Sequence, residues 1–528
     1  MKIMIFDSTL RDGAQAEGIS FTVEDKIKIA RALDDLGVDY IEAGNPGSNP
    51  KDLAFFTHFA KEDSLKNAKL IAFGSTRRKG ITAAEDNNVN AMLEADTEAI
   101  CIFGKSWDFH VTEILRAELD ENLAMIRDTI SFFKERGKEA IFDAEHFFDG
   151  YKRNPKYAMA SLTAAMEGGA DALVLCDTNG GCFPAEIFEI VKKVTAKFSM
   201  PIGIHTHNDC EMAVANSIMA VEAGATHVQG TFTGFGERCG NANLSAIIPS
   251  LQLKKGYDCV FPEAMQNLTT VARYISEIAN ISHNERAAYT GQTAFAHKGG
   301  MHIDAVSKAA ESFEHINPAA VGNERKYLMS EVAGRSLLLT KIQQVNPSLL
   351  KDSPETVAII QELKELEQKG YQFEGAESSF DLYIRKQLGK YKPLFELVNF
   401  KTIGEQPHLE GLGASAVIKI TVNGETEITA AEGNGPVNAL DKALRKALEK
   451  FYPELSKVQL TDYKVRVLDS TSATASRVRV LIESSDGKDS WTTVGVSTDI
   501  IEASWLALVD SIEYKLIQDI EQKFKAFI

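Results

Sequence analysis

The stretch Ile202–Asp209 reads IGIHTHND, a short apolar run that ends in two histidines two residues apart. The run has the length of a single buried strand. Side chains at positions i and i+2 of a strand point to the same face of the sheet. We therefore expect His205 and His207 to project together from the end of this strand. Two neighbouring imidazoles make half of a divalent-metal site.

The same kind of unit recurs along the first half of the chain, where short apolar runs alternate with amphipathic helical stretches. Nearly continuous apolar strands that alternate with helices indicate a parallel sheet covered by helices. Eight units in about 250 residues are typical of a (β/α)8 TIM barrel. An open doubly wound sheet is the alternative, but no GxGxxG follows the first run. The eight runs are Ile3–Phe6, Tyr40–Ala43, Leu70–Phe73, Ala99–Phe103, Ala140–Phe142, Ala172–Cys176, Ile202–Ile204 and His227–Gln229.

Polar side chains gather after the carboxyl ends of these runs, which is where active sites of this fold lie. Phe6–Gly13 reads FDSTLRDG and supplies Arg11 and Asp12. With His205 and His207, Asp12 predicts a site for one divalent cation such as Zn, Mn, Mg or Co. Arg11 beside a metal ligand suits stabilisation of an oxyanion. Glu145, after the fifth run, suits acid–base chemistry.

The remainder of the chain predicts two further domains after a barrel at 1–255. Residues 256–404 form a mostly helical connector that carries the motif HKGGMHIDA with His302. Residues 405–528 form an α+β domain with a duplicated β-β-α unit. Its strands begin with Ala416–Val422 and Arg477–Glu483, its helices cover Pro436–Phe451 and Asp499–Ile517, and Asn423-Gly424 and Asp486-Gly487 are its hairpin turns. A duplicated module without catalytic clusters suggests regulation or dimerisation.

Composition excludes several classes of function. The net charge of −17 argues against a general nucleic-acid or acidic-membrane surface. No run approaches the roughly 18 apolar residues of a membrane helix. The six cysteines form no CxxC pair, which is typical of reduced cytosolic thiols. We therefore expect a cytoplasmic protein.

The motifs FDSTLRDG, HTHND and GERCGNANL together resemble the DRE-TIM metallolyases, in particular their 2-isopropylmalate, homocitrate and citramalate synthase branch. Lys105–Leu115, Phe142–Lys152 and Asn317–Tyr327 most resemble the citramalate-forming members of that branch. The resemblance implies an acyltransferase that condenses acetyl-CoA with pyruvate and water to (R)-citramalate and CoA, in isoleucine biosynthesis. It also implies a homodimer with an amino-acid effector, isoleucine.

The resemblance also implies roles for single residues. Asp12, His205 and His207 match metal ligands, and Asn241 matches an additional ligand. Arg11 matches the arginine that stabilises the substrate oxygen, and Thr178 a residue that holds the keto acid carboxylate. His302 matches a catalytic histidine, with Glu145 as its acidic partner. Phe313 departs from the pattern, because members often carry tyrosine there; Tyr289 or Tyr327 could supply a hydroxyl instead.

Three alternatives stay open at this point. The first is the same chemistry on a larger 2-oxo acid, as in 2-isopropylmalate or homocitrate synthase. The second is an acyl-CoA lyase, and the third is a silent metabolite-binding protein. Bulky side chains expected on the rim loops, Phe103, Trp107 and Phe147, favour pyruvate, because they would exclude an isopropyl group.

Overall fold

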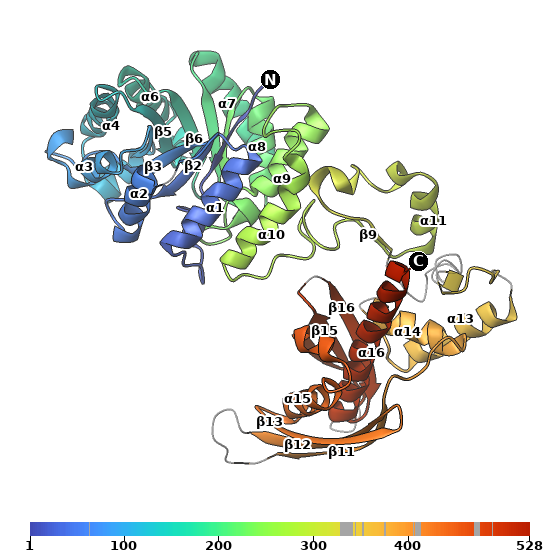
Figure 1. The fold of residues 1–528 in the computed structure, drawn as a ribbon. Helices are drawn as coiled ribbons and strands as arrows, with labels where there is room; N and C mark the ends of the chain where they lie inside the picture. Colours follow the sequence, from blue (N-terminus) through green and yellow to red (C-terminus); the bar gives the residue numbers. More distant parts are fainter. Residues whose placement is uncertain are drawn as a thin grey trace. The chain divides into compact units, whose positions relative to one another are not determined.

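The computed structural model describes residues 1–62, 64–327, 342–343, 345–350, 353–373, 376–404, 406, 413–468, 476–487 and 489–527. The chain divides into two compact units (Figure 1). The first unit comprises Met1–Ala296 and Glu314–Arg325, and the second comprises His297–Phe313 and Lys326–Ile528.

Eight parallel strands of the first unit form a closed barrel in sequence order. Strand β1 pairs with β2 on one side and with β8 on the other, so the sheet has no open edge. This confirms the predicted TIM barrel and excludes the open doubly wound sheet. The strands are β1 (Met4–Asp7), β2 (Tyr40–Gly44), β3 (Lys69–Ser75), β4 (Ala99–Lys105), β5 (Glu139–Glu145), β6 (Ala172–Asp177), β7 (Ile202–Thr206) and β8 (His227–Gly230).

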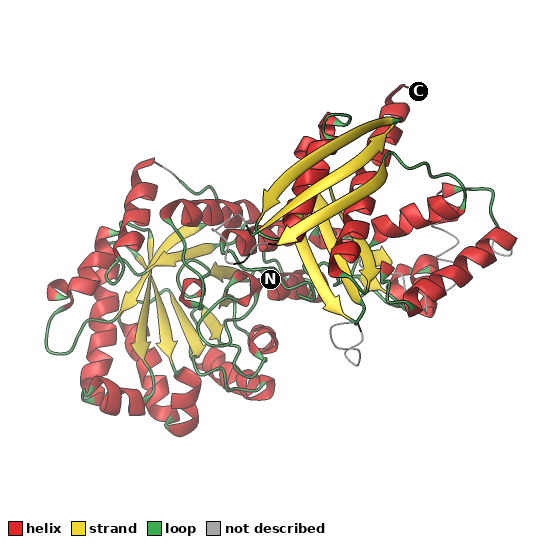
Figure 2. Ribbon diagram, turned by 90° about the horizontal axis from the view of Figure 1, so that it is seen from below, coloured by secondary structure: helices red, strands yellow, loops and turns green. Residues whose placement is uncertain are grey.

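Helices surround the strands on the outside of the barrel (Figure 2). Helix α1 illustrates why they form here: Thr22 and Asp25 make a capping box at its start, and Gly37 ends it with a φ of 90°. The helices are α1 (Val23–Leu36), α2 (Pro50–Glu62), α3 (Asn87–Glu94), α4 (Leu119–Lys134), α5 (Phe147–Arg153), α6 (Pro155–Glu167), α7 (Pro184–Lys197), α8 (Ala213–Glu222), α9 (Leu244–Pro249) and α10 (Leu268–Ile278).

The barrel has two separate apolar layers, because successive strand residues point to opposite faces. Phe6, Tyr40 and Val174 belong to the inner layer inside the barrel. Ile5 and Phe147 belong to the outer layer between strands and helices. Phe147 is fully buried there, so our expectation that it narrows a substrate pocket at the rim was wrong. The α5 helix turns this side chain toward the outer core.

The second unit begins with helices and ends with two similar α+β modules. Its helices before the modules are α11 (Gly300–Lys308), α13 (Pro354–Gln368) and α14 (Glu377–Gln387), and two short strands, β9 (Ala296–His297) and β10 (Lys326–Tyr327), pair at the junction of the units. The modules comprise β11 (Glu396–Gly404), β12 (Ala414–Val422), β13 (Glu425–Gly433) and α15 (Pro436–Leu448), then β14 (Gln459–Val467), β15 (Val478–Ser485), β16 (Ser490–Ser497) and α16 (Ile500–Phe527). Each three-stranded sheet is antiparallel.

Each module has one strand more than the predicted β-β-α unit. The additional strands, β11 and β14, pair with β12 and β15 and precede them in the chain. Strand β11 lies within the residues that the sequence analysis assigned to the connector. The strand was missed because it is mostly exposed, so it lacks the clear alternation of apolar and polar residues that marks a half-buried strand. The Asn423-Gly424 turn is confirmed: it joins paired Val422 and Glu425, with φ values of 50° and 83°.

Among the described residues, no helix combines the length and the apolar character that crossing a membrane requires.

Candidate active site

Three predicted metal ligands meet at the carboxyl end of the barrel. His205 is the next-to-last residue of β7, His207 follows that strand, and Asp12 lies in the loop after β1. Their candidate ligand atoms all lie within 4.8 Å of one another, and all three residues are buried. His205 Nε2 is 3.4 Å from both His207 Nε2 and Asp12 Oδ2. No other group of three such residues meets these criteria in the described part of the chain.

The donor atoms of this cluster fit a divalent cation. In the described part of the chain, Asp12 Oδ1 and Asn241 Oδ1 are buried and have no hydrogen-bond partner. Buried polar atoms without a partner are costly, and a bound cation would satisfy both oxygens. Two imidazoles with one or two hard oxygens suit Zn, Mn or Co, and leave positions open for a substrate.

The charges of the site shift the protonation equilibria of all three predicted ligands. Burial opposes ionisation of Asp12, but Arg11 and His205 hold the pKa of its carboxyl well below the usual range. Burial and the neighbouring His205 lower the pKa of His207 to about 4. His207 is therefore neutral near pH 7, and its lone pair is available for coordination. Burial also opposes protonation of His205, but the Asp12 carboxylate raises its pKa.

Arg11 is held in place by two carboxylates and an aromatic ring. Its Nε lies 2.7 Å from Glu42 Oε2, and its Nη1 lies 3.1 Å from Asp12 Oδ2. Its guanidinium carbon lies 3.7 Å above the centre of the Phe73 ring. Glu42 also accepts a hydrogen bond from Ser8. Arg11 is thus held in one position beside the predicted metal ligand Asp12, as oxyanion stabilisation requires.

The glycine-rich loop Gly234–Leu244 makes a tight turn that places Asn241. A Cβ on Gly236 would lie 2.2 Å from Asn241 Nδ2, and one on Gly240 would lie 2.0 Å from the carbonyl oxygen of Gly234. Asn241 Nδ2 donates to the carbonyl of Phe235, so its Oδ1 is left for another partner. Asn241 also forms an isolated β-bridge with His207. The glycines therefore serve the geometry of the loop.

Glu145 is the last residue of β5, and Thr178 directly follows the neighbouring strand β6. Glu145 Oε2 forms an ion pair with Lys105 Nζ, which comes from β4. The Thr178 hydroxyl accepts a hydrogen bond from the backbone N–H of His146, 2.9 Å away. Its own hydroxyl hydrogen can still donate to an anion. The acid–base role of Glu145 and the carboxylate-binding role of Thr178 stay predictions.

The predicted catalytic histidine, His302, belongs to the second unit and lies in the first turn of α11. Its exposed ring stacks on Phe313, with ring centres 4.1 Å apart. The aromatic residue at position 313 can thus support the imidazole without a hydroxyl. Tyr289 belongs to the first unit, where its hydroxyl is 2.9 Å from that of Ser250. The part of His302 in the reaction stays a prediction.

Sequence reasoning missed three residues that contact the site. Gln229 bonds to His205, Asp143 bonds to Gln229, and Lys105 pairs with Glu145. Gln229 and Asp143 are polar residues within otherwise apolar strands, which is a signal that could have found them. Burial and the Glu42 carboxylate raise the pKa of Asp143 to about 6.

A cavity of about 390 Å³ lies at the carboxyl ends of β3 and β4. Four cationic residues contribute to its lining: Arg77, Arg78, Lys79 and Lys105. Phe103 forms part of its apolar wall and stacks on Phe73, with ring centres 5.1 Å apart. Since Arg11 lies on the other side of the contact with Phe73, a continuous series of side chains joins this cavity to the metal ligands.

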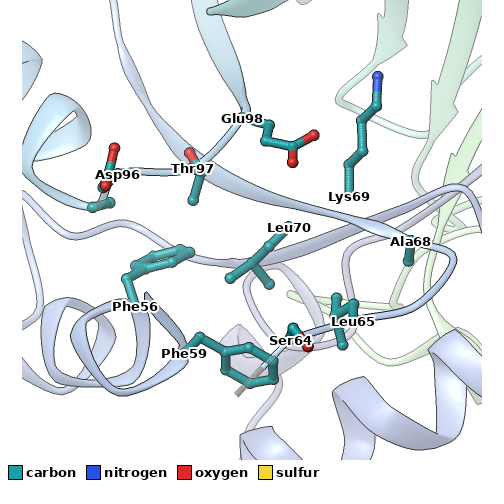
Figure 3. A pocket seen from close by; sticks show the side chains of 11 residues that line it. Phe56, Phe59, Ser64, Leu65, Ala68, Lys69, Leu70, Asp96, Thr97 and Glu98 are labelled. Carbon is teal, nitrogen blue, oxygen red and sulfur yellow. The ribbon is translucent and has the colours of Figure 1, made fainter. Parts of the chain in front are cut away.

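A second cavity, of about 210 Å³, lies near the amino ends of β3 and β4 (Figure 3). Phe56, Phe59 and Leu70 form its apolar wall, and Glu98 and Lys69 lie at its edge. It is at the opposite end of the strands from the metal ligands. We therefore do not assign it to the active site.

Comparison with known proteins supports this picture. The HMGL-like family matches residues 2–275. The (R)-citramalate synthase of Geobacter sulfurreducens is 52% identical over 515 residues, which cover 97% of this chain and 97% of that protein. The (R)-citramalate synthase of Aquifex aeolicus is 53% identical over 523 residues, 99% of each chain. This chain belongs to the (R)-citramalate synthase family. A probable 2-isopropylmalate synthase of Methanopyrus kandleri is 30% identical over 508 residues, which cover 96% of this chain and 97% of that protein.

Two further family models match the second half of this chain. The homocitrate synthase post-HMGL domain-like family matches residues 289–371, which include His302. The LeuA allosteric (dimerisation) domain matches residues 374–516. The match begins ahead of β11, in agreement with the pairing of β11 with β12 in one sheet.

Proposed function

We propose that this protein condenses acetyl-CoA with pyruvate and water to give (R)-citramalate and CoA. The observation that carries the proposal is the buried Asp12–His205–His207 cluster beside Arg11, in a chain 46–53% identical to five (R)-citramalate synthases. The five relatives at 46–53% identity are (R)-citramalate synthases, which favours pyruvate over a larger 2-oxo acid. The conjunction of metal ligands and Arg11 disfavours a silent binding protein.

The chain's own residues can account for the polar part of this reaction. A divalent metal held by Asp12, His205, His207 and Asn241 would supply Lewis-acid polarisation of the 2-oxo acid. Arg11 faces the same side and would stabilise negative charge as it develops on the ketone oxygen. Thr178 would donate a hydrogen bond to the substrate carboxylate.

The bond changes balance without an added oxidant or reductant. A base removes a proton from the acetyl methyl group, and the carbon that results bonds to the ketone carbon of pyruvate. The ketone oxygen takes up a proton and becomes a hydroxyl group. Water then cleaves the thioester and releases the CoA thiol. Glu145 and His302 are our candidates for the proton transfers.

The cavity at the carboxyl ends of β3 and β4 is our candidate binding site for acetyl-CoA. CoA carries phosphates, and cationic side chains bind phosphates well. Arg77 is paired with Glu121 and Asp128, and Arg78 with Asp86. Lys79 Nζ donates instead to the carbonyl of Arg116, a neutral partner. Lys79 therefore has the most available positive charge of the four.

A thiol-release assay tests the proposed reaction. Metal-loaded protein is incubated with acetyl-CoA and pyruvate, 2-oxoisovalerate or 2-oxoglutarate in parallel. We expect the highest kcat/KM with pyruvate, and no release after treatment with a chelator. Comparable kcat/KM values for pyruvate and 2-oxoisovalerate would contradict the choice of substrate, and release that persists without metal would contradict the mechanism.

We also infer a cytoplasmic homodimer that isoleucine regulates through residues 374–516. The match to an allosteric and dimerisation domain supports the domain's general role. The six cysteines are all unpaired, as expected in a reducing compartment. Hydrogen exchange of the full chain with isoleucine tests the effector, with leucine as the control ligand. We expect slower exchange within residues 374–516 and inhibition by isoleucine only.

A further inference from the structure

Two hydrogen bonds in series cross the interior of the barrel from Asp143 to His205. Gln229 Nε2 lies 2.9 Å from Asp143 Oδ1, and Gln229 Oε1 lies 2.9 Å from His205 Nδ1. The three residues come from β5, β8 and β7. All are buried, with exposed fractions of 0% for Gln229, 4% for Asp143 and 5% for His205.

The direction of the first bond determines the direction of the second. A side-chain amide has a donor end and an acceptor end, whereas a carboxylate only accepts. Asp143 therefore selects the Nε2 end of Gln229 and turns the Oε1 end toward His205. An amide oxygen can only accept a hydrogen bond, so His205 Nδ1 must carry its proton.

The consequence appears at the other nitrogen of the His205 ring. With the proton on Nδ1, the lone pair is on Nε2. This is the atom that lies 3.4 Å from His207 Nε2 and from Asp12 Oδ2. If the Gln229 amide were reversed, Nδ1 would accept and Nε2 would carry the proton, a form that cannot bind a metal through Nε2.

We propose that Gln229 and Asp143 are positioning residues that set the tautomer and orientation of His205, and thereby the affinity of the site for its metal. The proposal rests on the metal site of the proposed function. Partners of metal-binding histidines typically change metal affinity 10–100-fold when removed. Here the Gln229 amide lies between the Asp143 carboxylate and the His205 imidazole, so Asp143 influences His205 only through Gln229.

Plain packing of a barrel interior would have a different signature. Removing a buried amide that only packs lowers stability and leaves metal affinity unchanged. Asn216 offers a matched control, since it is also fully buried and donates to a backbone carbonyl, that of Cys182, from α8. Gln229→Leu and Asn216→Leu both remove one buried amide from the same unit.

The experiment measures the Kd for Co²⁺ and Zn²⁺ by competition with a chromophoric chelator, together with the visible spectrum of the Co²⁺ protein. We expect Gln229→Leu to weaken both Kd values by about 10–100-fold and to change the Co²⁺ spectrum. The double variant Gln229→Glu/Asp143→Asn keeps an acceptor for His205 Nδ1 and a donor–acceptor pair in the first bond, so it should recover most of the affinity. Asn216→Leu should bind like the wild type. Equal Kd values for Gln229→Leu and Asn216→Leu would overturn the proposal.

A measurement on the wild-type protein covers the case in which Gln229→Leu does not fold. Nitrogen-15 NMR of histidine-labelled, Zn²⁺-loaded protein reports which ring nitrogen is protonated, and His205→Asn identifies the signal. We expect a protonated Nδ1 and a coordinated Nε2; a coordinated Nδ1 would refute the proposal. Neither readout uses a substrate, so failure here is distinct from failure of the thiol-release assay on wild-type enzyme, which would refute the proposed function.

Discussion

The Nε2 atoms of His205 and His207 lie 3.4 Å apart, with Asp12 Oδ2 at the same distance from His205. The two ring nitrogens and the carboxylate oxygen are therefore close enough to bind one cation together. Burial and His205 lower the pKa of His207 to about 4, so this ring is neutral near pH 7 and can act as a ligand. A divalent cation is the partner that fits, and our first prediction follows from it.

His207→Ala is expected to abolish metal binding without unfolding the barrel. The substitution removes one of three clustered predicted ligands at a loop position after β7, outside the strands whose pairing closes the barrel. Metal content by mass spectrometry and circular dichroism check the two statements. His58→Ala, on α2, removes a histidine away from the cluster and should retain full metal content. A His207→Ala protein with one bound metal per chain would refute the ligand assignment.

Arg11→Lys is expected to lower kcat by about 10²–10³-fold, the effect of losing one well-placed oxyanion donor. Lysine keeps the charge but cannot bond to Glu42 and Asp12 at once with a rigid fork. Steady-state kinetics at saturating acetyl-CoA and pyruvate measure the change. Arg385→Lys is the control, because Arg385 also bonds to two carboxylates, Asp381 and Glu521, in the second unit. Wild-type kcat for Arg11→Lys would remove Arg11 from the mechanism.

Lys79→Glu is expected to raise the KM for acetyl-CoA about fivefold, which corresponds to roughly 1 kcal/mol, and to leave the KM for pyruvate unchanged. The reason is the phosphate of CoA, which an exposed ammonium attracts and a carboxylate repels. Lys197→Glu makes the same charge change at the end of α7, outside the lining of the cavity. Equal KM values for the two variants would place the acyl donor elsewhere.

The barrel is expected to lose stability on acidification because of His227. This side chain packs against the rings of both Phe6 and Tyr40 in the interior of the barrel. Burial lowers its pKa from 6.5 to about 4. Below pH 6.5 the unfolded chain therefore binds a proton that the folded chain does not, so the free energy of unfolding falls as the pH falls. From pH 7 to about pH 5 the loss from this group is about 2 kcal/mol.

Urea unfolding of the wild type and of His227→Phe at both pH values isolates this contribution. Phenylalanine keeps an aromatic ring in the inner layer and has no proton to gain. We expect the wild type to lose about 2 kcal/mol more than the variant between the two pH values. Equal losses would show that His227 is not a source of acid sensitivity.

Much of the barrel was predictable from sequence because its signals are local. Each apolar run has the length of one strand, and all eight runs coincide with observed strands. The i, i+2 spacing of His205 and His207 placed them together, and the polar residues after each strand indicated the active end. The first strand of each C-terminal module, β11 or β14, was not predictable. Both strands are largely exposed, so their sequences lack a clear alternation of apolar and polar residues.

What the sequence by itself determined is therefore the eight-stranded barrel, the cluster of Asp12, His205 and His207 as a predicted metal site, and the family, since each depends on short motifs and on the period of apolar residues. Only the tertiary structure decided which distant side chains act on those motifs. The bond between Gln229 and Asp143 joins residues 86 positions apart, on strands that are not neighbours in the barrel. Arg11 reaches Phe73, and Phe73 reaches Phe103, across three different strands or loops. Such contacts form only when the barrel closes, because closure brings inward-pointing side chains from non-adjacent strands within hydrogen-bond distance.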